Sequence, residues 1–126
     1  MTVHSETVAC VQGLVSPIVV YDGQVPRLPP VAYVLINQIN TRPVSRALSR
    51  DRHGSDNRWR LTVVSNSPEG VRAMCARLDP LDGVRVLGQR VEEVDTGMGV
   101  EEDDRVVTDG VPRWYTKREY RVSQPT

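Results

Sequence analysis

The sequence predicts an α+β fold, a mixed and mostly antiparallel sheet with two helices packed on one face. Two segments have the apolar spacing of helices, and five have the β-branched or alternating pattern of strands. Tight turns between the later strands favour antiparallel pairing, because parallel neighbours need a longer crossover. The chain has 126 residues, which fits a single domain spanning residues 1–126.

The two expected helices begin at capping residues. The first covers residues 5–15, with Ser5 as its N-cap. The second covers residues 68–78, with Ser67 as the N-cap and Pro68 at the first helical position. Its apolar residues recur at the i, i+3, i+4, i+7 spacing of one helical face: Val71, Met74, Cys75 and Leu78. It should end where Asp79 precedes Pro80, because a residue before proline disfavours helical backbone.

The expected strands share β-branched or aromatic residues and end at turn residues. They cover residues 17–21, 31–37, 58–65, 84–87 and 113–122. We interpret Gly88 as a bulge within the run of residues 84–94. Trp59 and, in the last strand, Trp114 and Tyr120 are expected in the core. Tyr115 lies on the opposite strand face from Trp114, so we predict that it lies at an interface.

Two long polar loops interrupt these elements. Residues 38–57 are rich in arginine and carry no convincing strand pattern, and residues 95–104 are acidic with two glycines. Long loops in small domains are usually functional or flexible. We therefore expect both loops to be mobile.

The sequence contains no pattern typical of catalysis or of a cofactor. His4 lies in an N-terminus that we expect to fray, and His53 lies in a polar loop, so neither is placed to act as a catalytic base. Cys10 and Cys75 have no ligand-like spacing, and we expect them to be small buried residues in a reducing compartment. Phosphate-binding glycine motifs are absent from the sequence. We expect no enzyme activity, no metal, no cofactor and no membrane span.

Charge is distributed in blocks of opposite sign. Sixteen basic residues balance sixteen acidic ones, which disfavours a dedicated nucleic-acid-binding protein. Residues 92–104 carry seven acidic residues and no basic one, whereas residues 42–60 and 113–121 are net basic. These blocks either are simply solvated or pair between subunits. Self-association also suits a chain of this length, which buries only part of its apolar surface.

The order of these segments resembles a known family. The initial helix, PIVVYDGQVP, VAYVLIN, the Arg-rich loop, RWRLTVVSNSPEGVRAMCARLDPLDG and WYTKREYRV look like a tail terminator protein of long-tailed, siphovirus-type actinobacteriophages. The resemblance covers residues 7–122 and rests on order and spacing, not on a catalytic motif. It implies a tail-terminator-like fold at the tail–neck junction of the virion, assembled in the host cytoplasm.

The resemblance also implies partners. A tail terminator forms a ring of about six subunits, caps the tail tube, stops its polymerisation and presents a surface to the head-completion (stopper) protein, while DNA passes through the lumen without specific binding. Candidate residues for gripping the tube or a neighbouring subunit are Arg42, Arg46, Arg50, Arg52 and Tyr115. Candidates for lining the lumen or pairing with arginines of the adjacent subunit are Glu101, Glu102, Asp103 and Asp104. The alternatives are another head-to-tail connector and, more distantly, a small nucleic-acid-binding regulator.

Overall fold

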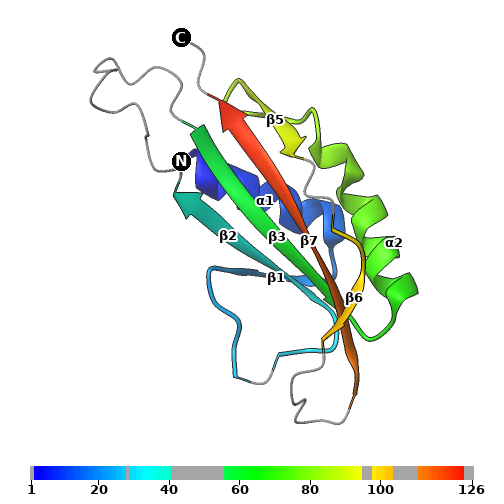
Figure 1. Ribbon diagram of the computed structural model, residues 1–126. Coiled ribbons are helices and arrows are strands. Elements are labelled where there is room, and N and C mark those ends of the chain that lie inside the picture. Colours follow the sequence, from blue (N-terminus) through cyan, green and yellow to red (C-terminus); the bar gives the residue numbers. More distant parts are fainter. Residues whose placement is uncertain (1, 28, 41–55, 95–97, 104–110, 124–126) are drawn as a thin grey trace.

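The computed structural model describes residues 2–27, 29–40, 56–94, 98–103 and 111–123. Two α-helices, one short 3₁₀ helix and seven strands follow one another along these residues (Figure 1). Their bounds are α1 Val3–Val15, β1 Val19–Asp22, β2 Tyr33–Asn40, β3 Asp56–Ser65, α2 Pro68–Leu78, η1 Asp79–Leu81, β4 Arg85–Val86, β5 Gln89–Val94, β6 Glu101–Asp103 and β7 Arg113–Ser123.

The sheet is mixed and mostly antiparallel, as predicted. Its strand order is β1-β2-β3-β7-β5-β4, and β6 also pairs with β7. Only the β1–β2 pair is parallel in the described part of the chain. Strand β7 pairs with β3 along one edge, while its other edge pairs with β6 near its start and with β5 near its end. The long β3 and β7 strands therefore form the centre of the sheet.

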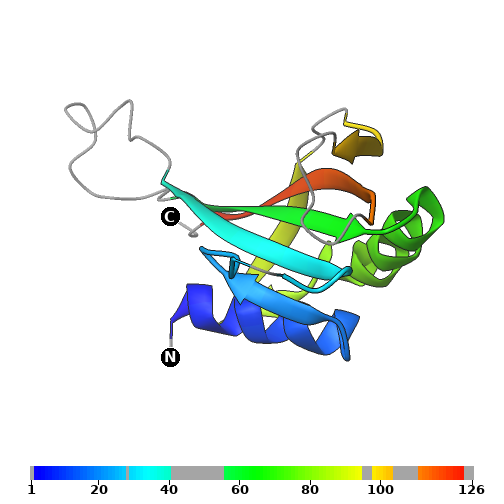
Figure 2. The same ribbon diagram turned by 90° about the horizontal axis from the view of Figure 1, so that it is seen from below.

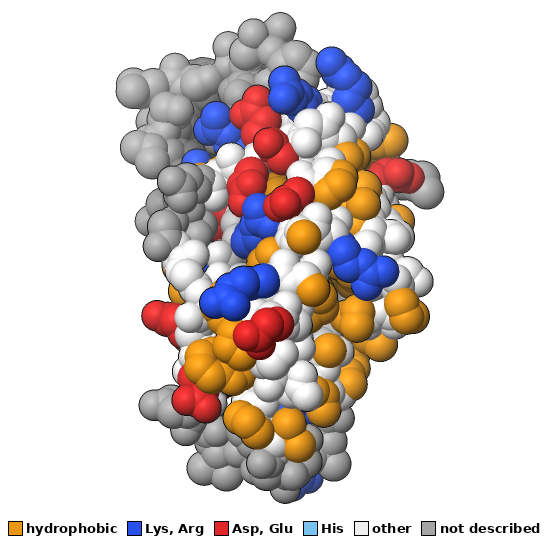
Figure 3. Space-filling model, turned by 90° about the vertical axis from the view of Figure 1, so that its right-hand side faces the viewer, with side chains coloured by type: hydrophobic (Ala, Val, Ile, Leu, Met, Phe, Trp, Pro, Cys, Tyr) orange, Lys and Arg blue, Asp and Glu red, His pale blue; other side chains and the backbone are white. Residues whose placement is uncertain are grey.

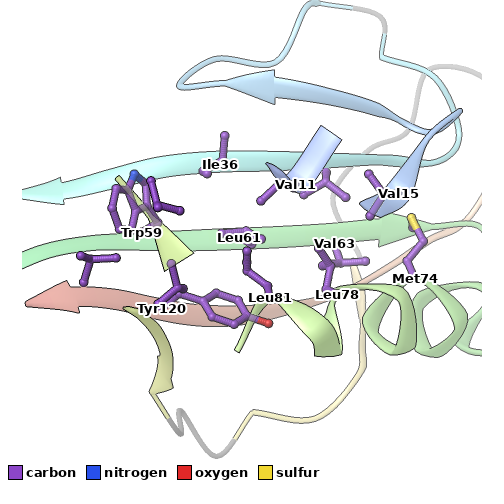
Figure 4. Close-up of a cluster of buried hydrophobic side chains, with 14 of the residues drawn as sticks. Val11, Val15, Ile36, Trp59, Leu61, Val63, Met74, Leu78, Leu81 and Tyr120 are labelled. Atoms are coloured by element: carbon purple, nitrogen blue, oxygen red, sulfur yellow. The ribbon is translucent and has the colours of Figure 1, made fainter. Parts of the chain in front are cut away.

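Both helices pack on one face of the sheet, which confirms the predicted layering. In Figure 2, α1 lies below the sheet. Apolar side chains of β2, β3, β5 and β7 meet those of α1 and α2 in one continuous core (Figure 4). Its largest fully buried members are Trp59, Tyr120, Ile36, Leu61, Leu78 and Leu81. Trp114 packs against this core from a partly buried position, so all three core aromatics lie on the face that alternation predicts.

Helix α2 begins and ends where the sequence predicts, whereas α1 begins earlier. Thr2, not Ser5, is the N-cap of α1. The Thr2 hydroxyl accepts from the Ser5 amide and the Ser5 hydroxyl accepts from the Thr2 amide, each at 3.0 Å. This reciprocal capping box satisfies two backbone donors and holds the first turn in place.

Three other boundaries differ from the predictions. Strands β2 and β3 reach Asn40 and Asp56, so the two ends of the predicted 38–57 loop are paired strand, and residues 41–55 lie outside the described residues. Residues 101–103 of the predicted acidic loop form β6. Leu87 and Gly88 make a tight hairpin turn between β4 and β5, with φ of 49° and 82°, where we predicted a bulge.

Gly70 in the first turn of α2 has no room for a side chain. A Cβ at this position would overlap the Ser65 hydroxyl and lie 3.0 Å from Ser65 Cβ. We expect Gly70→Ala to lower the free energy of unfolding by about 1–2 kcal/mol, although alanine is the better helix former. Gly13→Ala in α1, where a Cβ meets nothing within 4 Å, should instead raise stability by about 0.5–1 kcal/mol. Urea denaturation of both variants tests this, and equal effects would contradict it.

Candidate interaction surface

The face of the sheet opposite the helices is a candidate interaction surface in the described part of the chain. Alternate residues of β1, β2, β3 and β7 point toward it, and neither helix covers it (Figure 2). We call it the open face. Its residues along β2, β3 and β7 include Tyr33, Leu35, Asn37, Ile39, Arg58, Arg60, Thr62, Val64, Arg113, Tyr115, Lys117, Glu119 and Arg121.

One end of the open face is aromatic. Tyr21 and Tyr33 meet edge to face, with ring centroids 5.8 Å apart. Tyr115 lies in the same cross-strand row as Tyr33, two strands away, with Val64 between them. Three of the chain's four tyrosines therefore lie on this face, where the exposed Val19 adds apolar surface. Tyrosine combines a large apolar area with a polar group, which suits protein contacts.

The other end of the open face is charged. Arg60 pairs with Glu119 across β3 and β7 at 3.2 Å, and Arg121 pairs with Glu92 across β7 and β5 at 3.5 Å. Arg58 lies opposite Arg121 in the β3–β7 register. The Nε atom of Arg58 is buried and has no hydrogen-bond partner among the described residues. Among the side chains that the structure describes, this end therefore carries three arginines and two carboxylates.

The structure places only part of the residues predicted as sites. Tyr115 lies on the open face, and its hydroxyl donates to the Glu101 carboxylate at 3.2 Å. Glu101, Glu102 and Asp103 form β6 at the edge of the sheet beside the start of β7. Asp104 and the four loop arginines, Arg42, Arg46, Arg50 and Arg52, lie outside the described residues. The structure thus brings Tyr115 and Glu101 together.

Arg118 holds together a polar cluster that the sequence did not single out. Its guanidinium bonds Glu93 of β5 at 2.6 Å, Asp79 after α2 at 3.0 Å, and the backbone carbonyl of Cys75 at 2.8 Å. Burial alone would lower the pKa of Arg118, but the hydrogen bonds that its guanidinium donates to Glu93 and Asp79 raise this pKa above its ordinary value. The side chain is therefore a fixed cation that joins α2, β5 and β7.

A groove of about 430 Å³ lies beside this cluster. Arg72, Cys75 and Met98 contribute to its walls, and acidic and basic side chains lie side by side on this side of the molecule (Figure 3). Burial raises the pKa of Cys75 and of Cys10, so both thiols stay protonated at neutral pH and are poor nucleophiles. The described residues contain no cluster of three or more potential metal ligands.

His4 is ordered, contrary to the expectation of a frayed terminus. The buried indole N–H of Trp59 donates to His4 Nδ1 at 2.9 Å, and His4 Nε2 lies 2.9 Å from the Asp22 carboxylate. Because Nδ1 accepts a hydrogen bond, the neutral ring carries its proton on Nε2 and donates it to Asp22. Both ring nitrogens therefore take part in hydrogen bonds, and these two hydrogen bonds connect α1 to β1 and β3. Sequence spacing gave no indication of this contact between residues 55 positions apart.

Tyr120 lies in the core beside Arg118, and its burial predicts a loss of stability at alkaline pH. Burial raises the pKa of its phenol above the ordinary value, and the Arg118 charge offsets only part of this increase. The unfolded chain releases this proton near pH 10 while the folded chain keeps it, so stability should fall as the pH rises above about 10. The hydroxyl is buried and has no hydrogen-bond partner among the described residues.

We therefore expect Tyr120→Phe to be neutral or stabilising by about 1 kcal/mol at pH 7 and to lose less stability than the wild type above about pH 10. Urea denaturation at a series of pH values measures both effects. The two cysteines are present in both proteins, so their titration cancels in the difference. If the free energy of unfolding of the variant fell with alkaline pH as steeply as that of the wild type, this account would be contradicted.

Comparisons with known proteins bear on the fold alone. No family model matches the chain, and no curated protein sequence does either. A solved structure of a protein whose name states no function is similar, with a TM-score of 0.54 and 16% sequence identity, over 94% of this chain and 89% of that chain. At this identity the likeness supports the α+β architecture. No helix in the described ranges has the length and apolarity that crossing a membrane requires.

Proposed function

We propose that this protein is a structural, non-catalytic tail terminator of a long-tailed phage. It forms a ring that caps the tail tube, stops its polymerisation and provides the surface for head attachment. The observation that carries the proposal is the open face, which has a tyrosine end and an arginine end on a chain with an acidic edge strand. Tyrosine and arginine are enriched in the energetic centres of interfaces. The sequence resemblance supports the choice of a tail terminator among ring-forming proteins.

Under this proposal the ring consists of about six copies, and its two sides contact different proteins. One side binds the tail tube protein, and the other side binds the head-completion protein at the tail–neck junction. A formal net charge of zero fits a lumen through which DNA passes without specific binding, because a strongly basic lumen would retain phosphate.

The mass of the purified protein in solution tests the proposal. We expect light scattering at micromolar concentrations, with negative-stain images of the same sample, to show rings of about six subunits. Assembly that needs the tube as a template would instead give a monomer that binds purified tail tubes. A monomer that does not bind the tubes would overturn the proposal. Rings that bind heads but not tubes would point to another connector of the same particle.

The tube-gripping role of the Arg-rich loop is tested separately. Neutralising Arg46 and Arg50 together should abolish docking to tail tubes, because two fixed charges are removed from the predicted contact. The matched control removes the same charge from Arg27 and Arg72, which are exposed in the linker after β1 and on α2. Co-sedimentation with tubes measures the difference. Unchanged docking of the Arg46 and Arg50 variant would overturn this assignment.

A further inference from the structure

Two charged patches of opposite sign lie at opposite ends of the open face. The basic patch comprises Arg58, Arg60 and Arg121, and among the described side chains it keeps one positive charge in excess after pairing with Glu119 and Glu92. The acidic edge comprises Glu101 and Glu102 of β6, both exposed and without an ion pair among the described residues. Glu101 is paired with Tyr115 and shares the open face, whereas Glu102 is paired with Trp114 and points to the opposite face. Strand β6 is an edge strand, since β7 is its only partner in the described part of the sheet.

A single chain cannot bring these two patches together. Glu101 is paired in register with Tyr115, and the basic patch centres on Arg121, six residues further along β7. A strand rises about 3.4 Å per residue, which separates the patches by about 20 Å. That distance is more than twice the screening length of about 8 Å at physiological salt, so the attraction between them within one chain is largely screened.

We infer that the occupant of the basic patch is a second copy of this chain, whose acidic edge docks onto Arg58 and Arg121. The inference rests on the proposed function and deepens it by naming the contact between subunits. Both patches belong to one chain, whose formal net charge is zero. A second copy of the chain therefore carries, for each patch, a patch of the opposite sign.

The residues next to each patch fit the same contact. Tyr115 adjoins Glu101, so a docking β6 also brings this ring toward the arginines of the neighbouring copy. Guanidinium groups stack on aromatic faces and pair with carboxylates in one plane. The buried Nε of Arg58, which has no partner among the described residues, is the donor that such a carboxylate would satisfy.

Charge-reversal variants test the contact. Arg58→Glu puts a carboxylate opposite Arg121 in the register and is not expected to disturb the fold. We expect Arg58→Glu alone and Glu101→Arg alone to raise the concentration at which subunits assemble by at least about tenfold. An equimolar mixture of the two variants should assemble again, because the reversed face of one matches the reversed edge of the other. The double variant in one chain should also assemble.

The matched controls are Arg72→Glu and Glu69→Arg, the same reversals on the exposed surface of α2. Both should assemble like the wild type, and thermal melts monitored by circular dichroism should show that all variants are folded. The inference is overturned if the single variants assemble like the wild type, or if neither the mixture nor the double variant recovers the ability to assemble. In those cases wild-type rings would still support the proposed function. A wild type that neither assembles nor binds tubes would overturn both.

Discussion

Trp59→Ala is expected to lower the free energy of unfolding by about 3–5 kcal/mol. The Trp59 side chain is fully buried, at 0% exposure, in the central strand β3, directly opposite Tyr120 in the register. Removing the ring leaves a cavity that the surrounding sheet cannot close, and it also leaves His4 Nδ1 without its donor. Small domains have a total stability of about 5–15 kcal/mol, so a large part of the population should unfold on mild heating.

The chain offers a matched control in its second tryptophan. Trp114 is only partly buried, so Trp114→Ala should cost less than half as much as Trp59→Ala. Trp59→Phe keeps most of the apolar volume but removes the N–H, and we expect an intermediate loss. Urea denaturation monitored by circular dichroism measures all three. If the two alanine variants lost equal stability, Trp59 would not be the centre of the core.

The contact of Trp59 with His4 shows which part of the structure the sequence could predict. Alternation in β3 predicts that Trp59 faces the core, and the capped pattern of α2 predicts both ends of that helix. These signals are local, because each depends on residues within one or two turns of the chain. The order of the strands and the Trp59–His4–Asp22 contact depend on residues far apart in sequence, which no periodicity reports.

The predicted interface residues show the same limit. Alternation in the last strand predicts that Tyr115 faces away from Trp114, and the structure confirms this orientation. The sequence pattern of residues 101–103 indicates a loop, and only the pairing of β6 with β7 shows that they form a strand. The position of Glu101 beside Tyr115 therefore could not be predicted. Short edge strands have too few residues for an alternating pattern to stand out. That the Nε atom of Arg58 has no hydrogen-bond partner among the described residues likewise follows only from packing.

Arg118→Ala is expected to lower the free energy of unfolding by about 2–3 kcal/mol, the second-largest loss predicted for a single substitution. The Arg118 side chain is 17% exposed and bonds groups from three elements: Glu93, Asp79 and the Cys75 carbonyl. Its removal leaves two carboxylates close to each other and a helix-end carbonyl without its donor. The partial exposure of Asp79 and Glu93 keeps the loss below that of a fully buried pair.

The neighbouring Arg121 provides the control. It also pairs with a glutamate of β5, but at 3.5 Å and with 42% of its side chain exposed, so Arg121→Ala should cost under about 0.5 kcal/mol. Arg118→Lys should fall between wild type and Arg118→Ala, because an ammonium keeps the charge but cannot reach all three acceptors in one plane. Denaturation midpoints of the alanine variants, measured at low and high salt, distinguish the contributions of the two arginines to stability. A loss for Arg118→Ala no larger than that for Arg121→Ala would show that this cluster does not join α2 to the sheet.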